Sequence, residues 1–127
     1  MYKEMIISII LVCLIFVGDF VSQKYTKNTV NSLTGILEDL KASLLEKDKE
    51  EASKEIEALD KIWEDVHDKL ACYIEHDELE KVETNFTACK SLSENGDFVL
   101  AVSELEKTVF VLEHIIDKYS FNLVNIF

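Results

Sequence analysis

The sequence predicts an all-α protein in which an N-terminal transmembrane helix leads into an antiparallel bundle of about four helices. Three observations predict this fold class. The chain of 127 residues contains no Pro and 3 Gly, so it holds very few helix-breaking residues. Residues 5–18 form a continuous apolar run near the N-terminus. After that run, apolar residues recur at alternating steps of three and four, which is the spacing of one face of an α-helix.

The apolar run is predicted to be an uncleaved membrane anchor covering residues 1–22. A helix needs about 20 residues to cross a bilayer. Residues 2–21 supply this length, and their charged side chains stand near the ends, where they reach the membrane surface. No pair of small residues of the kind that precedes a signal-peptidase site follows the run, and the run lacks the polar stripe of a core helix. A cleaved signal peptide and a soluble core helix are the alternatives.

Residues 23–127 are predicted to form one extracytoplasmic helical domain, held at the cell membrane by a single pass. About one hundred residues are enough for one small core and not for two. The numbers of lysines on the two sides of the anchor are nearly equal, so the positive-inside rule decides little. A short N-terminal signal-anchor usually carries the larger part of a chain across the membrane, which favours an extracytoplasmic domain.

Four series of apolar residues predict four helices, over residues 30–44, 52–73, 79–92 and 98–119. The first helix can be continuous with the anchor, because no linker rich in Gly or Ser separates the two. The series consist of Val30, Leu33, Leu37, Leu40 and Leu44; Ala52, Ile56, Leu59, Trp63, Val66, Leu70 and Tyr73; Leu79, Val82, Phe86, Cys89 and Leu92; and Phe98, Ala101, Leu105, Val109, Leu112, Ile116 and Tyr119.

The helix boundaries carry capping signals. Asp48 with Glu51, and Asp77 with Glu80, have the spacing of a capping box, in which an acidic side chain accepts hydrogen bonds from free backbone N–H groups at a helix start. Residues 95–97 read Asn-Gly-Asp, so the Gly can end one helix in the left-handed conformation and the Asp can cap the next. Such short connections predict antiparallel neighbours.

The charge of the chain limits its partners. The 13 basic residues are all Lys and stand against 25 acidic residues, which gives a formal net charge of -12. Binding to the phosphate backbone of nucleic acid needs a basic face, so nucleic acid is excluded as a partner. An anionic lipid surface repels an acidic domain, so we expect the membrane contact at the N-terminal helix.

No motif of enzyme chemistry is present in the sequence. Glu64 and His67 have the spacing used by di-metal carboxylate bundles, but His76 and His114 have no Glu three residues before them, so a second such pair is missing. A metal-binding bundle is therefore the least favoured interpretation. His76 is expected near a helix C-terminus, where it can interact with free carbonyl groups. We predict no enzyme activity, no catalytic residue and no cofactor.

Trp63 and the C-terminal segment are the two aromatic or apolar features of interest. Trp63 occupies a position in the second apolar series, which favours packing in the core. Residues 121–127 read Phe-Asn-Leu-Val-Asn-Ile-Phe and follow the last apolar series. We expect this segment to fold back over the end of the bundle; docking to a partner protein is the alternative.

Four features resemble a known bacterial family, domain of unknown function 4363. They are a charged helix with a central Trp63, residues 73–78 at the opening of the next helix, residues 112–115 in the last helix, and residues 125–127, all behind a short N-terminal anchor. The resemblance implies a small single-pass membrane protein of spore-forming Firmicutes without an assigned activity. It also implies a candidate partner, a YetF-like membrane protein encoded beside some members.

The sequence therefore predicts a membrane-anchored interaction or accessory module of the bacterial cell envelope, working with a protein partner. A ligand-sensing helical ectodomain is the alternative, and it requires a concave apolar pocket with convergent polar groups. The candidate structural or interaction residues are Trp63, His76, Glu78, His114, Asn125, Ile126 and Phe127.

Overall fold

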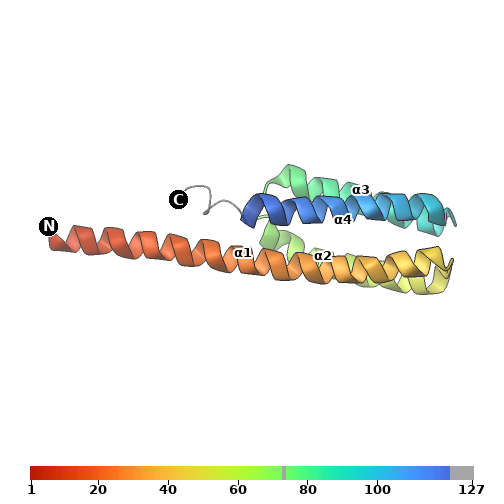
Figure 1. Cartoon of the computed structure of the whole chain (residues 1–127), viewed down its shortest axis with the longest axis horizontal. Coiled ribbons are helices and arrows are strands. Elements are labelled where there is room, and N and C mark those ends of the chain that lie inside the picture. The colour runs from red at the N-terminus through yellow and green to blue at the C-terminus, as the bar shows by residue number, and fades with distance from the viewer. Residues whose placement is uncertain (73, 121–127) are drawn as a thin grey trace.

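The computed structural model of the chain describes residues 1–72 and 74–120. These residues form four α-helices and no strand: α1 (Tyr2–Leu45), α2 (Lys49–Leu70), α3 (His76–Glu94) and α4 (Phe98–Ser120) (Figure 1). The predicted all-α fold with four helices is confirmed. The first predicted helix and the apolar run are one helix, because α1 continues without a break from the N-terminus into the bundle.

The four helices run alternately in opposite directions, and the N-terminal part of α1 projects beyond the bundle (Figure 1). With 44 residues at about 1.5 Å per residue, α1 is roughly 66 Å long. The helix α4 packs against both α1 and α3, and α1 also packs against α2. The contact between α2 and α3 is the least extensive of these four neighbouring pairs.

The core of the bundle consists of the predicted apolar series. Every described member of the four series is buried or packs against the buried cluster, which confirms the helical spacing. Tyr73 and the side chain of Tyr119 lie outside the described residues. Burying a Val, Leu or Ile side chain contributes about 1.5–3 kcal/mol. The apolar contacts of the core are therefore the main source of stability. Ile74 and Ile115 add to the core from positions outside the predicted series.

Two connections lie at the end of the bundle far from the N-terminus, between α1 and α2 and between α3 and α4. At both, the helices end and begin where the capping signals predict. The side chain of Asp48 accepts a hydrogen bond from the backbone N–H of Glu51 at 3.2 Å. Gly96 has a φ of 78°, in the left-handed region. The side chain of Asp97 accepts a hydrogen bond from the backbone N–H of Leu100 at 3.3 Å. Both predicted helix starts are confirmed.

The end of α1 uses the left-handed conformation at a residue with a side chain. Lys47 has a φ of 58°. Its N–H donates to the carbonyl of Leu44 at 3.1 Å, and the N–H of Asp48 donates to the carbonyl of Ser43 at 3.0 Å. These two bonds form a Schellman motif, which satisfies carbonyl groups left free at a helix end. A Cβ atom in this conformation is strained, so the turn stores a small amount of energy.

The predicted start of α3 was wrong. Asp77 lies inside the first turn, and the N-cap is Glu75, whose side chain makes no capping hydrogen bond. The physical reason is burial, because Ile74 and Leu79 are 4% and 0% exposed and occupy the two positions of a hydrophobic staple around that N-cap. Apolar packing on both sides of the helix start outweighs a side-chain cap of about 1 kcal/mol.

Candidate functional site

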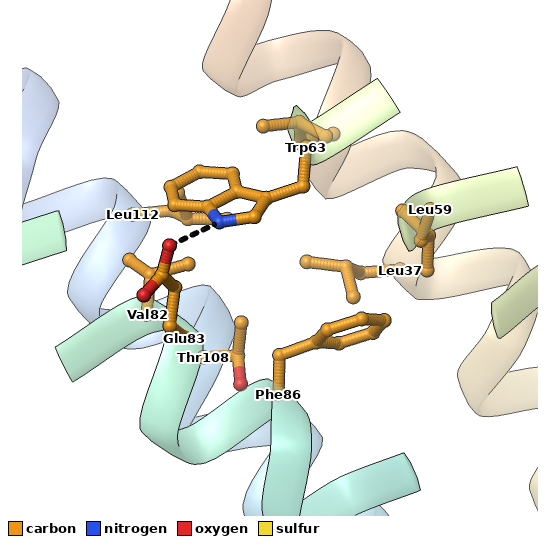
Figure 2. Close-up of a pocket in the computed structure, with 9 residues that line it drawn as sticks. Leu37, Leu59, Trp63, Val82, Glu83, Phe86, Thr108 and Leu112 are labelled. Atoms are coloured by element: carbon orange, nitrogen blue, oxygen red, sulfur yellow. Dashed lines mark hydrogen bonds between the residues drawn. The ribbon is translucent and has the colours of Figure 1, made fainter. Parts of the chain in front are cut away.

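The most distinctive polar cluster lies where α2 meets α3. The indole N–H of Trp63 on α2 donates a hydrogen bond to Oε1 of Glu83 on α3 at 3.0 Å (Figure 2). His67 follows Trp63 by four residues; its ring centroid lies 5.7 Å from that of the indole, in an edge-on arrangement. Nε2 of His67 lies 3.3 Å from the same Glu83 oxygen. One half-exposed carboxylate thus joins two aromatic rings of the opposite helix.

A small apolar cavity lies beneath the Trp63 indole (Figure 2). Its volume is about 30 Å³, against roughly 10–15 Å³ for the space that one water molecule needs. The side chains that line it come from all four helices: Leu33, Leu37, Leu59, Trp63, Val82, Glu83, Phe86, Thr108 and Leu112. A space of this size is too small for a ligand with convergent polar groups.

A second polar bridge spans the same pair of helices nearer the far end of the bundle. Nζ of Lys90 on α3 donates to Oδ2 of Asp60 on α2 at 2.8 Å. This hydrogen bond, together with the attraction of the opposite charge, raises the pKa of Lys90 above its ordinary value. The contact between α2 and α3 therefore combines sparse apolar packing with hydrogen bonds and ion pairs between partly exposed side chains.

Glu78 is a buried charge at the start of α3. Its residue is 6% exposed, and its Oε1 lies 3.7 Å from Nζ of Lys118 on α4 and 3.9 Å from Nζ of Lys81. Lys118 also lies 3.3 Å from Oε2 of Glu75. The second oxygen of Glu78 has no hydrogen-bond partner among the residues that the structure describes. The arrangement ties the beginning of α3 to the end of α4.

The other candidate residues are not brought together with Trp63. His76 is the first residue of α3, with its Nε2 3.8 Å from Oε2 of Glu80, so its predicted place at a helix C-terminus was wrong. This correction follows from the earlier start of α3. His114 is exposed on α4. Asn125, Ile126 and Phe127, and with them the expected fold-back of residues 121–127, lie outside the described residues.

Two partly exposed polar residues at helix contacts were missed by sequence reasoning. Glu83 follows a core position and reads as an ordinary solvated residue. Glu55 on α2 accepts a hydrogen bond from Oγ of Ser43 on α1 at 2.9 Å, and its other oxygen is buried without a hydrogen-bond partner among the described residues. Burial, the largest cause, raises the pKa of Glu55. Both residues flank an apolar series, which is a weak signal that many solvated residues share.

In the described part of the chain, no group of three or more His, Cys, Asp or Glu side chains is placed to hold a metal ion. His67 lies beside Glu83 and Asp68, His76 lies beside Glu80, and His114 is on a third helix. The three histidines therefore occupy separate surroundings.

The fold and this cluster define a class of protein, a four-helix bundle whose first helix extends as an exposed apolar rod. The family model "Domain of unknown function (DUF4363)" matches residues 20–126. The chain belongs to this family, and the resemblance seen in the sequence is confirmed. The matched residues cover the bundle and leave out the whole apolar run of residues 5–18. No match was found among curated proteins or among solved structures.

Proposed function

We propose that the protein is a non-enzymatic accessory module that is anchored in the cell membrane by α1 and presents its helical bundle to a protein partner. One observation carries the proposal. The N-terminal part of α1 contains an 18-residue window with a mean hydropathy of 2.6, and none of this window is buried in the structure. Removing a large apolar side chain from water is worth about 1.5–3 kcal/mol, so such a rod strongly favours an apolar surrounding.

The dimensions of α1 fit a single crossing of a bilayer. Residues 2–21 span about 30 Å at 1.5 Å per residue, which equals the thickness of a typical hydrocarbon core. The remaining part of α1 begins to be buried in the bundle at Thr26. Only a few residues separate the two, so the bundle stands directly above the membrane. We also propose that the bundle lies outside the cytoplasm, in the cell envelope, because a short N-terminal signal-anchor usually carries the larger part of a chain across the membrane.

The bundle itself supports a role in binding a protein. The described residues offer a small apolar cavity, and the chain carries a formal net charge of -12. An accessory role with a membrane protein fits this simplicity. The YetF-like protein implied by the family resemblance is the first partner to test, by crosslinking and co-purification from native membranes.

A charge placed within the apolar run tests the anchor. Ile10 lies in the middle of the run and is exposed, and a Lys at the centre of a membrane helix costs about 2.5–3.5 kcal/mol by insertion scales. We expect Ile10→Lys to shift the protein from the membrane pellet to the alkaline carbonate extract. Val99→Lys is the matched control, because Val99 is 78% exposed on α4 within the bundle. Equal extraction of wild type and Ile10→Lys contradicts the proposal, as does a mature mass lacking about twenty N-terminal residues.

A further inference from the structure

The large hydrophobic side chains that stay exposed outside the apolar run lie on α1 and α4. Leu45 at the end of α1 is 63% exposed, and Val99 and Phe110 on α4 are 78% and 71% exposed. Leu100, next to Val99, is 52% exposed. Among the described residues of α2 and α3, no large hydrophobic side chain is exposed. One exposed hydrophobic side chain is ordinary, but a group of them on one side of a small domain indicates a contact surface.

An ion pair shows that three of these side chains share one surface. Lys41 on α1 contacts Glu106 on α4, and the two helices are packed neighbours (Figure 1). Leu45 follows Lys41 by four residues, so it lies one turn farther along the same side of α1. Val99 precedes Glu106 by seven residues and Phe110 follows it by four, so both lie on its side of α4. We call this surface the α1–α4 face; from Val99 to Phe110 it is about 17 Å long, or three helical turns.

The charges that border the α1–α4 face are mostly negative. The hydrogen bond and the charge of Glu106 raise the pKa of Lys41, and the charge of Glu38 adds to this effect. Nζ of Lys107 lies 3.0 Å from Oε1 of Glu104. Other exposed charged residues at the ends and sides of the face are Glu38, Glu46, Asp48, Asp97 and Glu113, against Lys47. This acidic border favours a partner surface that carries basic side chains.

The height of the α1–α4 face argues against lipid as its occupant. Counting equal steps along antiparallel α1 and α4 from the ion pair places Phe110 level with residue 37 and Val99 level with residue 48. With residues 2–21 in the hydrocarbon core, the face lies about 24–40 Å beyond that core, whereas the headgroup layer is roughly 5–8 Å thick. Residues 121–127 span at most about 25 Å when extended, and Val99 lies about 32 Å from the level of residue 120. These residues therefore cannot cover the whole face.

We propose that the α1–α4 face binds an extramembrane amphipathic helix of the partner protein, which carries one apolar stripe with Lys or Arg beside it. This inference rests on the proposed function and assigns the surface that performs it. A straight face of three turns fits a helix, whose apolar stripe covers Val99 and Phe110 while its basic side chains meet the acidic border. A second copy of this chain is a poor occupant, because it sets one acidic border against another.

Photocrosslinking of the full-length protein in native membranes tests the face. The photoreactive amino acid p-benzoylphenylalanine is placed at position 110, or at position 61 as the matched control. The side chain of Lys61 is 76% exposed on α2, and the hydrogen bond between Ser43 and Glu55 places it level with residue 37, the height of Phe110. We expect an adduct with another protein from position 110 and none from position 61. The crosslinked peptide, sequenced by mass spectrometry, should show apolar residues at helical spacing together with Lys or Arg.

Substitutions test the chemistry of the contact with the photoreactive amino acid moved to position 99. Phe110→Ala should lower the yield of the adduct about tenfold, because central aromatic side chains carry much of the binding energy of an interface. Glu113→Lys should also lower the yield, because it repels basic side chains. Lys61→Ala is the control and should leave the yield unchanged. Phe110, Glu113 and Lys61 are all exposed, and circular dichroism checks that each variant keeps the helical fold.

The outcomes separate this inference from the proposed function. An adduct with a second copy of the chain, with residues 121–127, or with a segment lacking Lys and Arg overturns the inference, as do equal yields from positions 110 and 61. If another protein is captured from position 61 and not from position 110, the α1–α4 face is refuted while the accessory function stands. If neither position captures a protein, the proposed function fails together with the face.

Discussion

Replacing Trp63 tests whether the contact between α2 and α3 depends on one side chain. The indole is partly buried against the core, covers the 30 Å³ cavity and donates to Glu83. Truncating a large aromatic in a core costs about 3–5 kcal/mol. Trp63 is not fully buried and the enlarged space opens toward water, so we expect Trp63→Ala to lower the free energy of unfolding by about 3 kcal/mol, at the low end of that range.

The hydrogen bond can be separated from the packing. Trp63→Phe keeps a ring over the cavity and removes the N–H donor, so it should cost about 0.5–1.5 kcal/mol, the usual net value of a hydrogen bond. The assay is urea unfolding of the detergent-solubilised full chain, followed by circular dichroism. Phe110→Ala is the control, because Phe110 is 71% exposed on α4 and its loss should change stability by less than about 0.5 kcal/mol. A loss below about 1 kcal/mol for Trp63→Ala would refute the reasoning.

Two further predictions concern Lys47, in the connection after α1, and Glu55, which accepts a hydrogen bond from Ser43 near the end of α1. Lys47→Gly should stabilise the protein by about 0.5–1 kcal/mol in urea melts, because Gly adopts the left-handed φ of 58° without strain; Lys47→Ala, which keeps the Cβ atom, should bring no such gain. Burial raises the pKa of Glu55 above its ordinary value of 4.5. At a pH between the unfolded and the folded pKa, Glu55 is therefore protonated in the folded state and ionised in the unfolded state. The free energy of unfolding should therefore fall as pH rises from the unfolded pKa through the raised folded pKa. Glu55→Gln should flatten this fall in melts taken across that range, whereas Glu57→Gln, at an exposed residue, should leave it unchanged.

The sequence was sufficient to predict the helices and most of their ends because those features depend on local spacing. Apolar steps of three and four locate the buried faces, and Asp48 and Gly96 locate two helix boundaries. The start of α3 was missed because it depends on tertiary burial. Asp77 has a strong local preference for capping, but Ile74 and Leu79 are held in the core by other helices, and this packing sets the boundary.

The polar cluster between α2 and α3 could not be predicted for a similar reason. Trp63 and His67 are recognisable as neighbours on one helix, but the carboxylate that joins them comes from α3, and its partner depends on how two helices are aligned. The sequence places Glu83 beside a core position and gives no information on the side chain it faces. Lys47 likewise carries no local signal for a left-handed turn, which Gly or Asn usually provides.

Because α1 is one unbroken helix, an anchor of the proposed kind would move together with the bundle. Transmembrane helices tilt by about 20° on average and adjust this angle to the thickness of the bilayer. If residues 2–21 span the hydrocarbon core as proposed, the helix extends about 36 Å beyond that core from residue 21 to the end of α1 at Leu45. A change in tilt of 20° swings the far end sideways by about 12 Å, because no hinge absorbs the motion. A protein bound near the far turns would therefore register the thickness of the surrounding membrane as a displacement.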